Sequence, residues 1–340
     1  MTDHQTAPQD ASADASGTMR AIVQDEYGRP DVLELRQVDR PPRAEDRVLI
    51  RVVASSVNAY DWHMTTGTPY MARAVAGLTR PAYPIPGADV AGVVEAVGSS
   101  VSGFAVGDEV FGDIGRGAFA EFASVNPRAI TRKPAGVTFA QAAAVPLAGL
   151  TALQGLRDVG GLQSGDNVLV NGASGGVGTF AVQIAKALGA DVTAVCSTSK
   201  VDMVRSIGAD QVIDYTRDDY TRTERDYDLV FDNVGDRPWR QTSRVLAPDG
   251  IVVSVTGPKH ALFGPLRNYL ARKLASTFST KTMAWFTAHV SQADLDSLAE
   301  MLDSGAITPV VERTYPLERL PEALRYLGEG HAIGKTVIEI

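Results

Sequence analysis

The sequence is nearly free of cysteine and has no long apolar segment. Cys196 is the single cysteine among 340 residues, which excludes an intrachain disulfide and a thiolate zinc cluster. We expect Cys196 to pack in the core rather than to act as a nucleophile. No uninterrupted run of apolar residues is long enough to cross a bilayer, so we predict no transmembrane segment and a cytoplasmic location.

Positive charge and histidine are scarce as well. Lys and Arg number 32 against 40 Asp and Glu, and the net charge is −8. Because an acidic surface gains nothing from binding a polyanion, we expect no nucleic-acid partner. The five histidines lie far apart and near no cysteine, so the sequence predicts no metal site.

The chain shows two sequence patterns, one after the other. Short β-type segments at 20–23, 46–53, 88–97 and 120–125 are separated by Gly and Pro, as in a small barrel. Further along, apolar strands alternate with helices, which predicts a parallel sheet. Its expected strands are 167–171, 191–196, 211–214, 228–232, 250–255 and 281–286, followed by a capped amphipathic helix over 291–304.

Two late strands, 309–314 and 335–340, are expected to rejoin the N-terminal barrel, so that the parallel sheet is an insertion in the chain. The first residues are polar and contain no apolar segment, which predicts a disordered tail rather than a signal peptide. The predicted units are a tail over 1–18, a β domain over 19–133 and 305–340, and a cofactor-binding domain over 134–304.

The most informative segment is an apolar strand that runs into a glycine turn and then a helix. The strand Asn167 to Asn171 and the helix starting near Thr179 enclose the turn residues Gly172, Ala173, Ser174, Gly175, Gly176, Val177 and Gly178. With the next strand at 191–196 they form one βαβ unit of about 30 residues, the context expected of a dinucleotide site. Glycines there permit a tight turn, close approach of a pyrophosphate and close helix packing, while the helix N-terminus attracts the phosphates.

The residues after the second strand indicate which dinucleotide binds. An NAD site ends this strand with an Asp or Glu that holds the ribose hydroxyls. This chain has Ser197, Thr198, Ser199 and Lys200 there, which favours the 2′-phosphate of NADPH. The alternative is that the three hydroxyls only cap the helix that begins near Val201.

Several blocks carry a resemblance to a known family. They are 56–62 (SVNAYDW), 86–94 (PGADVAGVV), 104–110 (FAVGDEV), 146–152 (PLAGLTA), the glycine turn, and 330–337 (GHAIGKTV). The chain resembles the zinc-free medium-chain dehydrogenase/reductases, the quinone oxidoreductases, over 19–340. It looks most like the chloroplast-envelope quinone oxidoreductase homologues and the reticulon-4-interacting mitochondrial proteins. The resemblance implies a Rossmann-type parallel-sheet domain inserted in a GroES-like β-barrel catalytic domain, with the active site in the cleft between them.

The chain differs from the zinc-dependent relatives at two positions, and these differences limit the reactions that it can catalyse. Those enzymes place a zinc-binding Cys where this chain has Asn58 and a zinc-binding His where it has Ala88. Neither side chain replaces a thiolate or an imidazole as a ligand. We therefore predict NADPH-dependent hydride transfer to acceptors that are already electrophilic, namely quinones and α,β-unsaturated carbonyls (enones and enals).

The catalytic candidates are Asn58, Tyr60 and Asp61. The resemblance puts Asn58 beside the nicotinamide and the substrate, and the Tyr60 hydroxyl could donate to an oxyanion. An alternative is structural, because Asn58 and Asp61 have the spacing of a helix cap and an acidic first turn, and Tyr60 could simply line the pocket.

Further cofactor contacts follow from topology and from the resemblance. Ligands of open parallel sheets lie beyond the carboxyl ends of the strands, which points to Asn233, Val255 and Thr256. The resemblance adds Tyr215 and Lys200 near the adenosine phosphate and Thr151 near the nicotinamide. Each of these residues could instead serve packing.

Two other functions remain open at this point. The chain could be an NAD(P)-dependent alcohol dehydrogenase of the same superfamily, or an NADPH-binding interaction protein without catalysis. Apolar residues over 260–289 are expected to form core and the interface of a possible homodimer, or alternatively a lid for a lipophilic acceptor.

Overall fold

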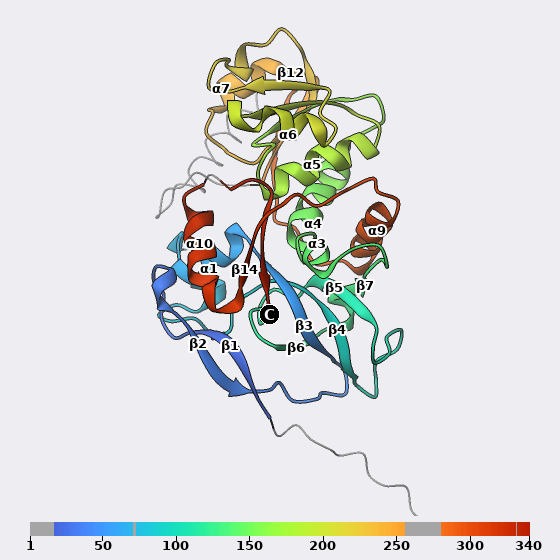
Figure 1. The fold of residues 1–340 in the computed structure, drawn as a ribbon. Coiled ribbons are helices and arrows are strands. Elements are labelled where there is room, and N and C mark those ends of the chain that lie inside the picture. The colour runs from blue at the N-terminus through green and yellow to red at the C-terminus, as the bar shows by residue number, and fades with distance from the viewer. Residues whose placement is uncertain (1–16, 71–72, 256–279, 331) are drawn as a thin grey trace, which may run out of the picture.

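Two β-sheets organise the chain, one in each half of the molecule (Figure 1). The computed structural model describes residues 17–70, 73–255, 280–330 and 332–340. The predicted contact at Thr256 and the segment 260–279 therefore lie outside the described residues, as do residues 1–16 of the predicted tail. Within the described part, no helix is both long and apolar enough to cross a membrane.

The barrel half, in the lower part of Figure 1, is a seven-stranded sheet of order β14-β15-β3-β4-β5-β7, with β6 added beside β3. Its strands are β3 (Val48–Val57), β4 (Asp89–Val97), β5 (Glu109–Asp113), β6 (Phe122–Val125), β7 (Ile130–Arg132), β14 (Val311–Pro316) and β15 (Lys335–Glu339). A separate antiparallel pair, β1 (Thr18–Gln24) and β2 (Leu33–Asp39), packs beside it. A backbone hydrogen bond links β1 to the segment before β6, because the Ile22 N–H donates to Phe119 O at 2.9 Å.

The C-terminal segment returns to this barrel, as predicted. Strand β15 pairs antiparallel with β3, and β14 pairs parallel with β15. The apolar residues of β15 explain the return, because Val337 and Ile338 are fully buried there. The parallel sheet between β7 and β14 is thus an insertion in a GroES-like fold.

The second half, at the top of Figure 1, is a parallel sheet of order β10-β9-β8-β11-β12-β13. Its strands are β8 (Asn167–Asn171), β9 (Asp191–Cys196), β10 (Gln211–Asp214), β11 (Tyr227–Asp232), β12 (Leu246–Ser254) and β13 (Thr282–Trp285). The first three match the predicted ranges, and the others agree within a few residues. This order is that of a Rossmann-type fold, in which ligands bind where the strand order reverses, between the parallel strands β8 and β11.

Helices connect and cover the sheets. They are α1 (Ala59–Thr66), α2 (Arg73–Ala76), α3 (Phe139–Ala143), α4 (Pro146–Gln154), α5 (Gly176–Ala187), α6 (Val201–Ser206), α7 (Trp239–Thr242), α9 (Gln292–Asp303) and α10 (Leu320–Gly328). Helix α4 continues as a π-helical turn over Gly155–Val159. Helix α9 begins as predicted, because the Ser291 hydroxyl accepts the Asp294 N–H.

One hydrophobic core crosses the junction between the halves. The largest buried cluster joins Ala54, Ala91 and Phe111 of the barrel to residues of α4, α5 and the parallel sheet. Figure 1 shows α3 and α4 lying between the two sheets. This continuous core holds the end of β3 and the starts of β4 and β15 close to the N-terminus of α5.

Candidate functional site

The glycine turn leads from β8 into α5 as the sequence predicts. Ala173 and Ser174 are buried, and the Ala173 N–H donates to Val195 O on β9 at 3.1 Å. Gly175 is the N-cap of α5 in an extended conformation, and no side chain caps the helix. The N-terminal amide groups of α5 therefore remain available for an anion.

The glycines at 175, 176 and 178, at the start of α5, have different surroundings. A Cβ on Gly175 would meet only Gly172 O, at 3.6 Å, so the turn is open at this point. A Cβ on Gly178 would lie 2.1 Å from Gly172 O, so this glycine is required for packing of the helix on the turn. A Cβ on Gly176 would meet Lys335 Cδ at 3.1 Å and Gly334 O at 3.3 Å. The open space at Gly175 fits a pyrophosphate, as a dinucleotide requires.

The residues predicted at the adenosine end lie together beyond β9 and β10. The Thr198 hydroxyl donates to Asp214 Oδ2 at 2.5 Å, and Tyr215 is 57% exposed with its N–H donating to Cys196 O. Neither Ser197 nor Lys200 caps a helix with its side chain, and α6 begins at Val201 as expected. The structure thus gives the Ser197 side chain no capping role.

The remaining cofactor candidates are Asn233, Val255 and Thr151, and they differ in how far contacts within the protein already occupy their side chains. Asn233 follows β11, and its Nδ2 donates to Asn171 O at 3.2 Å while its Oδ1 has no partner among the described residues. Val255 follows β12 and is half-buried. The Thr151 hydroxyl donates to Leu147 O at 2.7 Å within α4, which is the packing role considered above.

Asn58 and Asp61 form the helix start that their spacing predicts. Asn58 is the N-cap of α1, and its backbone N–H donates to Asp61 Oδ2 at 2.8 Å. Asp61 is 1% exposed, and its other oxygen finds no partner in the described part of the chain. Burial, together with the nearby charge of Asp89, raises the pKa of Asp61 to about 7.

The Asn58 side chain belongs to a capping box with Asp61 at the start of α1, and it also contacts two charged residues. Its Oδ1 accepts from Lys335 Nζ, and its Nδ2 donates to Asp89 Oδ2 at 2.8 Å. Lys335 begins β15, next to Gly334, whose N–H donates to Ser174 O of the glycine turn at 2.8 Å. The polar side chains at the end of the barrel sheet therefore adjoin the predicted cofactor cradle.

Tyr60 lies on the first turn of α1 and is 38% exposed. Burial and the neighbouring Asp61 and Asp113 carboxylates raise the pKa of its hydroxyl, so Tyr60 stays protonated near neutral pH. Burial and the charge of Asp89 raise the pKa of Asp113 to about 7. These side chains form the more exposed side of the same polar cluster.

Sequence reasoning missed Lys335, Asp89 and Asp113. Lys335 and Asp89 are 2% and 0% exposed, although they stand in otherwise apolar strands. That mismatch is the signal that could have found them, because a charged residue in a buried strand requires a partner. Cys196 behaves as expected, since burial raises its thiol pKa to about 11.

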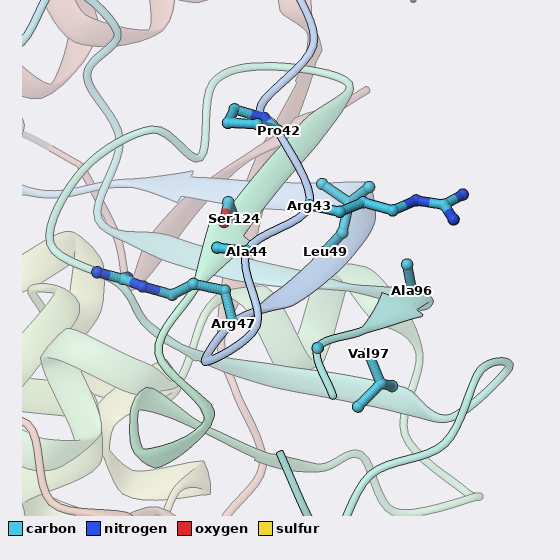
Figure 2. Close-up of a pocket in the computed structure, with 9 residues that line it drawn as sticks. Pro42, Arg43, Ala44, Arg47, Leu49, Ala96, Val97 and Ser124 are labelled. Carbon is cyan, nitrogen blue, oxygen red and sulfur yellow. The ribbon is translucent and has the colours of Figure 1, made fainter. Parts of the chain in front are cut away.

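A shallow pocket elsewhere is unrelated to this cluster (Figure 2). It is lined by Pro42, Arg47, Leu49 and Ala96 among others. Leu49 lies near the start of β3 and Asn58 just after its end, nine positions further along the chain. At about 3.3 Å per residue the two are roughly 30 Å apart along the strand.

No group of three or more His, Cys, Asp or Glu side chains arranged to hold a metal ion occurs among the described residues. Asn58 has its carboxamide engaged by charged neighbours, and Ala88 is fully buried. Neither position offers the thiolate or imidazole that zinc sites use.

Comparisons with known proteins agree with this arrangement. Residues 44–135 match the alcohol dehydrogenase GroES-like domain, and residues 207–338 match a family described as zinc-binding dehydrogenase. The chain is 36% identical to mouse mitochondrial NAD(P)H oxidoreductase RTN4IP1, over 96% of this chain and 90% of the relative. It is 33% identical to the chloroplast envelope quinone oxidoreductase homolog of Arabidopsis thaliana, over 96% and 99% of the two chains. Identity to the NADPH-dependent alkenal/one oxidoreductase of the same plant is 34%, over 98% and 83%.

Solved structures show the same fold. The quinone oxidoreductase of Coxiella burnetii superposes with a TM-score of 0.85 at 29% identity, covering 95% of this chain and all of that one. The Escherichia coli quinone oxidoreductase, solved in complex with NADPH, has a TM-score of 0.82 at 25% identity, covering 94% and 100%.

Proposed function

Since the chain belongs to the quinone oxidoreductase family of medium-chain dehydrogenase/reductases, we propose that it is an NADPH-dependent reductase of quinones and α,β-unsaturated carbonyls. The observation that carries the proposal is the contact between the glycine turn and the polar cluster, made by Gly334 and Ser174. Relatives named for quinone, alkenal/one and NAD(P)H chemistry support it.

NADPH, when bound, supplies the hydride that reduces the acceptor. The turn from Ala173 to Gly178 would hold the pyrophosphate, because no side chain caps the first amides of α5 and Gly175 leaves space for it. Lys200 and the Ser197 hydroxyl would face the 2′-phosphate, next to Thr198, whose hydroxyl would have to leave Asp214 in order to donate to it. Asn233 and Val255, which follow β11 and β12, would line the crevice where the strand order reverses, and Tyr215 would lie near the adenosine phosphate.

The chain's own residues orient the acceptor and stabilise charge. When a hydride reaches the electrophilic carbon, the π electrons of the acceptor move onto its carbonyl oxygen, and one proton then completes the reduction. The Asn58 amide and the Tyr60 hydroxyl are the donors proposed for that oxygen. Asp61 holds the N-terminal turn of α1, and through it the backbone of Asn58, in place.

The two alternative functions are weaker. An alcohol dehydrogenase of this superfamily activates its alcohol through zinc, and Asn58 and Ala88 provide no ligands for it. A purely NADPH-binding interaction protein would have no need for a buried polar cluster at the acceptor side of the cofactor cradle.

Steady-state and stopped-flow oxidation of NADPH with a panel of quinones, enones and enals tests the proposal. We expect turnover with at least one acceptor class and none with simple alcohols and NADP⁺. Tight NADPH binding without turnover across the panel would favour the interaction protein instead. Alcohol oxidation that depends on stoichiometric bound zinc would favour the alcohol dehydrogenase.

Location and assembly complete the proposal. We propose that the enzyme is cytoplasmic. Because the names of the three relatives above refer to mitochondria or chloroplasts, cell fractionation is needed to check the location. We also propose a homodimer. Among the described strands, β13 is the last of the parallel sheet, which would suit pairing between two copies. Light scattering of the purified protein measures this directly.

A further inference from the structure

Four polar side chains lie at the same end of the barrel sheet: Lys335 on β15, Asn58 just after β3, Asp89 on β4 and Asp113 on β5. The register pairs Thr336 with Val57, Ser56 with Asp89, and Asp89 with Asp113. Lys335 at the start of β15 and Asn58 after β3 therefore stand in one row with the two aspartates. This end of the sheet is the one that contacts the glycine turn.

Lys335 is the cation of the row and is 2% exposed. Its Nζ donates to Asn58 Oδ1, to Val57 O at 3.3 Å and lies 3.5 Å from Asp89 Oδ2. Burial lowers the pKa of Lys335, while the Asp89 carboxylate opposes that shift and favours the charged form. A buried ion pair of this kind adds little stability compared with apolar residues of similar size. Stability therefore does not explain why Lys335 is here.

The Asn58 amide is held at both ends by these charges. Lys335 engages Oδ1, and Asp89 accepts from Nδ2 at 2.8 Å, so the amide has one orientation. Asp89 is itself held by the Ser56 hydroxyl at 2.6 Å and by the Leu147 N–H at 2.9 Å. The second hydrogen of Asn58 Nδ2 has only a weak contact, to Ser56 O at 3.5 Å.

We propose that Lys335 is a positioning residue of the acceptor site, which orients the Asn58 amide for donation to the acceptor oxygen and stabilises the negative charge that forms there. This inference rests on the proposed function. During reduction one hydride adds to the acceptor carbon, the π pair becomes the oxyanion, and water supplies the proton. A fixed donor and a fixed positive charge next to the oxyanion lower the barrier without rearrangement.

The first test compares variants of the whole protein by kinetics and by NADPH binding. Lys335→Met removes the charge, and the double variant with Asp89→Asn avoids leaving a buried carboxylate unpaired. We expect kcat to fall about 100-fold, the loss typical of one oxyanion donor, with less than a threefold change in the NADPH dissociation constant. Lys186→Met is the matched control, because Lys186 pairs with Asp210 at the far end of α5.

Coupling to Asn58 separates positioning from a general structural role. If Lys335 acts through the amide, Lys335→Met should cost little further activity in an Asn58→Ala background. Independent, multiplying losses would overturn the proposal. So would weakened NADPH binding with unchanged kcat, which would assign Lys335 to the cofactor phosphates instead.

A second measurement needs no turnover. In the NADP⁺ complex, 4-nitrophenol serves as a probe whose absorbance reports its ionisation. We expect the wild-type protein to lower the pKa of bound nitrophenol below that of the free phenol, and the double variant to remove the shift. An identical pKa in both proteins would overturn the proposal. A wild-type protein that reduces no acceptor would instead refute the proposed function, so the two failures are distinguishable.

Discussion

Two glycines of the same turn should respond to alanine in opposite ways. At Gly178 a Cβ would lie 2.1 Å from Gly172 O and 2.8 Å from two backbone atoms of Ala173. Backbone atoms cannot rotate away as a side chain does, so the helix must shift by about 1 Å on the turn. Such overpacking costs about 3 kcal/mol, offset by about 1 kcal/mol from the better helix propensity of alanine.

We therefore expect Gly178→Ala to lose about 2 kcal/mol of stability. For a domain of this size that corresponds to a Tm lower by about 4–8 °C. At Gly175 the same methyl meets only Gly172 O at 3.6 Å, and φ of −84° suits any L-residue. Gly175→Ala should therefore change stability by less than about 1 kcal/mol, the usual range for an N-cap without a side-chain bond.

NADPH binding should be affected in the opposite order, more by Gly175→Ala than by Gly178→Ala. The Gly175 methyl would occupy the space proposed for the pyrophosphate and displace it from the amides of α5. Charge-assisted hydrogen bonds contribute about 1.5–3 kcal/mol each, so losing one or two weakens NADPH about 100-fold. Thermal unfolding without cofactor and fluorescence titration with NADPH measure the two effects. Equal NADPH affinities for Gly175→Ala and the wild-type protein would refute this account of the cradle.

Three further predictions concern the cofactor, pH and metal. Lys200→Ala should weaken NADPH about 10- to 100-fold and NADH less than threefold, because only NADPH carries the 2′-phosphate. Asp61 has a folded-state pKa of about 7 against 3.8 ordinarily, so the folded state holds an extra proton between these values. Stability should therefore fall as pH rises from about 5 to 8, with Asp61 contributing on the order of 3 kcal/mol. In urea titrations Asp61→Asn should remove this contribution and leave that of Asp113, whose pKa is raised in the same way. Prolonged chelation of divalent metal should leave quinone turnover unchanged.

Each of these has a control and a contradicting result. Lys200→Arg keeps the charge and should retain NADPH preference, whereas equal losses for NADPH and NADH would show that Lys200 does not contact the 2′-phosphate. Asp202→Asn changes a fully exposed carboxylate, so its pH profile should follow the wild-type one. A pH profile of Asp61→Asn that parallels the wild type would contradict the burial argument. Recovery of chelated activity by added zinc would contradict a metal-free reaction.

Several elements were predictable because their signals are local. Strands β8, β9 and β10 are apolar runs bounded by turn residues, and their predicted ranges match the structure. The start of α1 was also readable, because Asn58 and Asp61 interact across only three positions. Strand β2 was not predicted, since its side chains are mostly exposed and its pattern is set by pairing with β1.

The candidate site also has one part that local sequence predicts and another part that it does not. The turn from Ala173 to Gly178 is contiguous, so its residue types and its neighbouring strand and helix were enough to predict a dinucleotide cradle. The role of the Asn58 amide depends on Lys335, which is 277 positions away in the chain. Only the pairing of β15 with β3 brings the two together, and no local pattern reports that pairing.

Local spacing along the chain, together with the family resemblance of several sequence blocks, was thus sufficient for the fold class, the cofactor and the absence of zinc ligands at positions 58 and 88. These depend on residue type and on contacts within a few positions. The environment of the acceptor site depended on the folded chain, because Asp89 of β4, Lys335 of β15 and Asn58 at the start of α1 are far apart in the sequence. Burial then alters the charge properties of its members, and burial is a property of the packed structure.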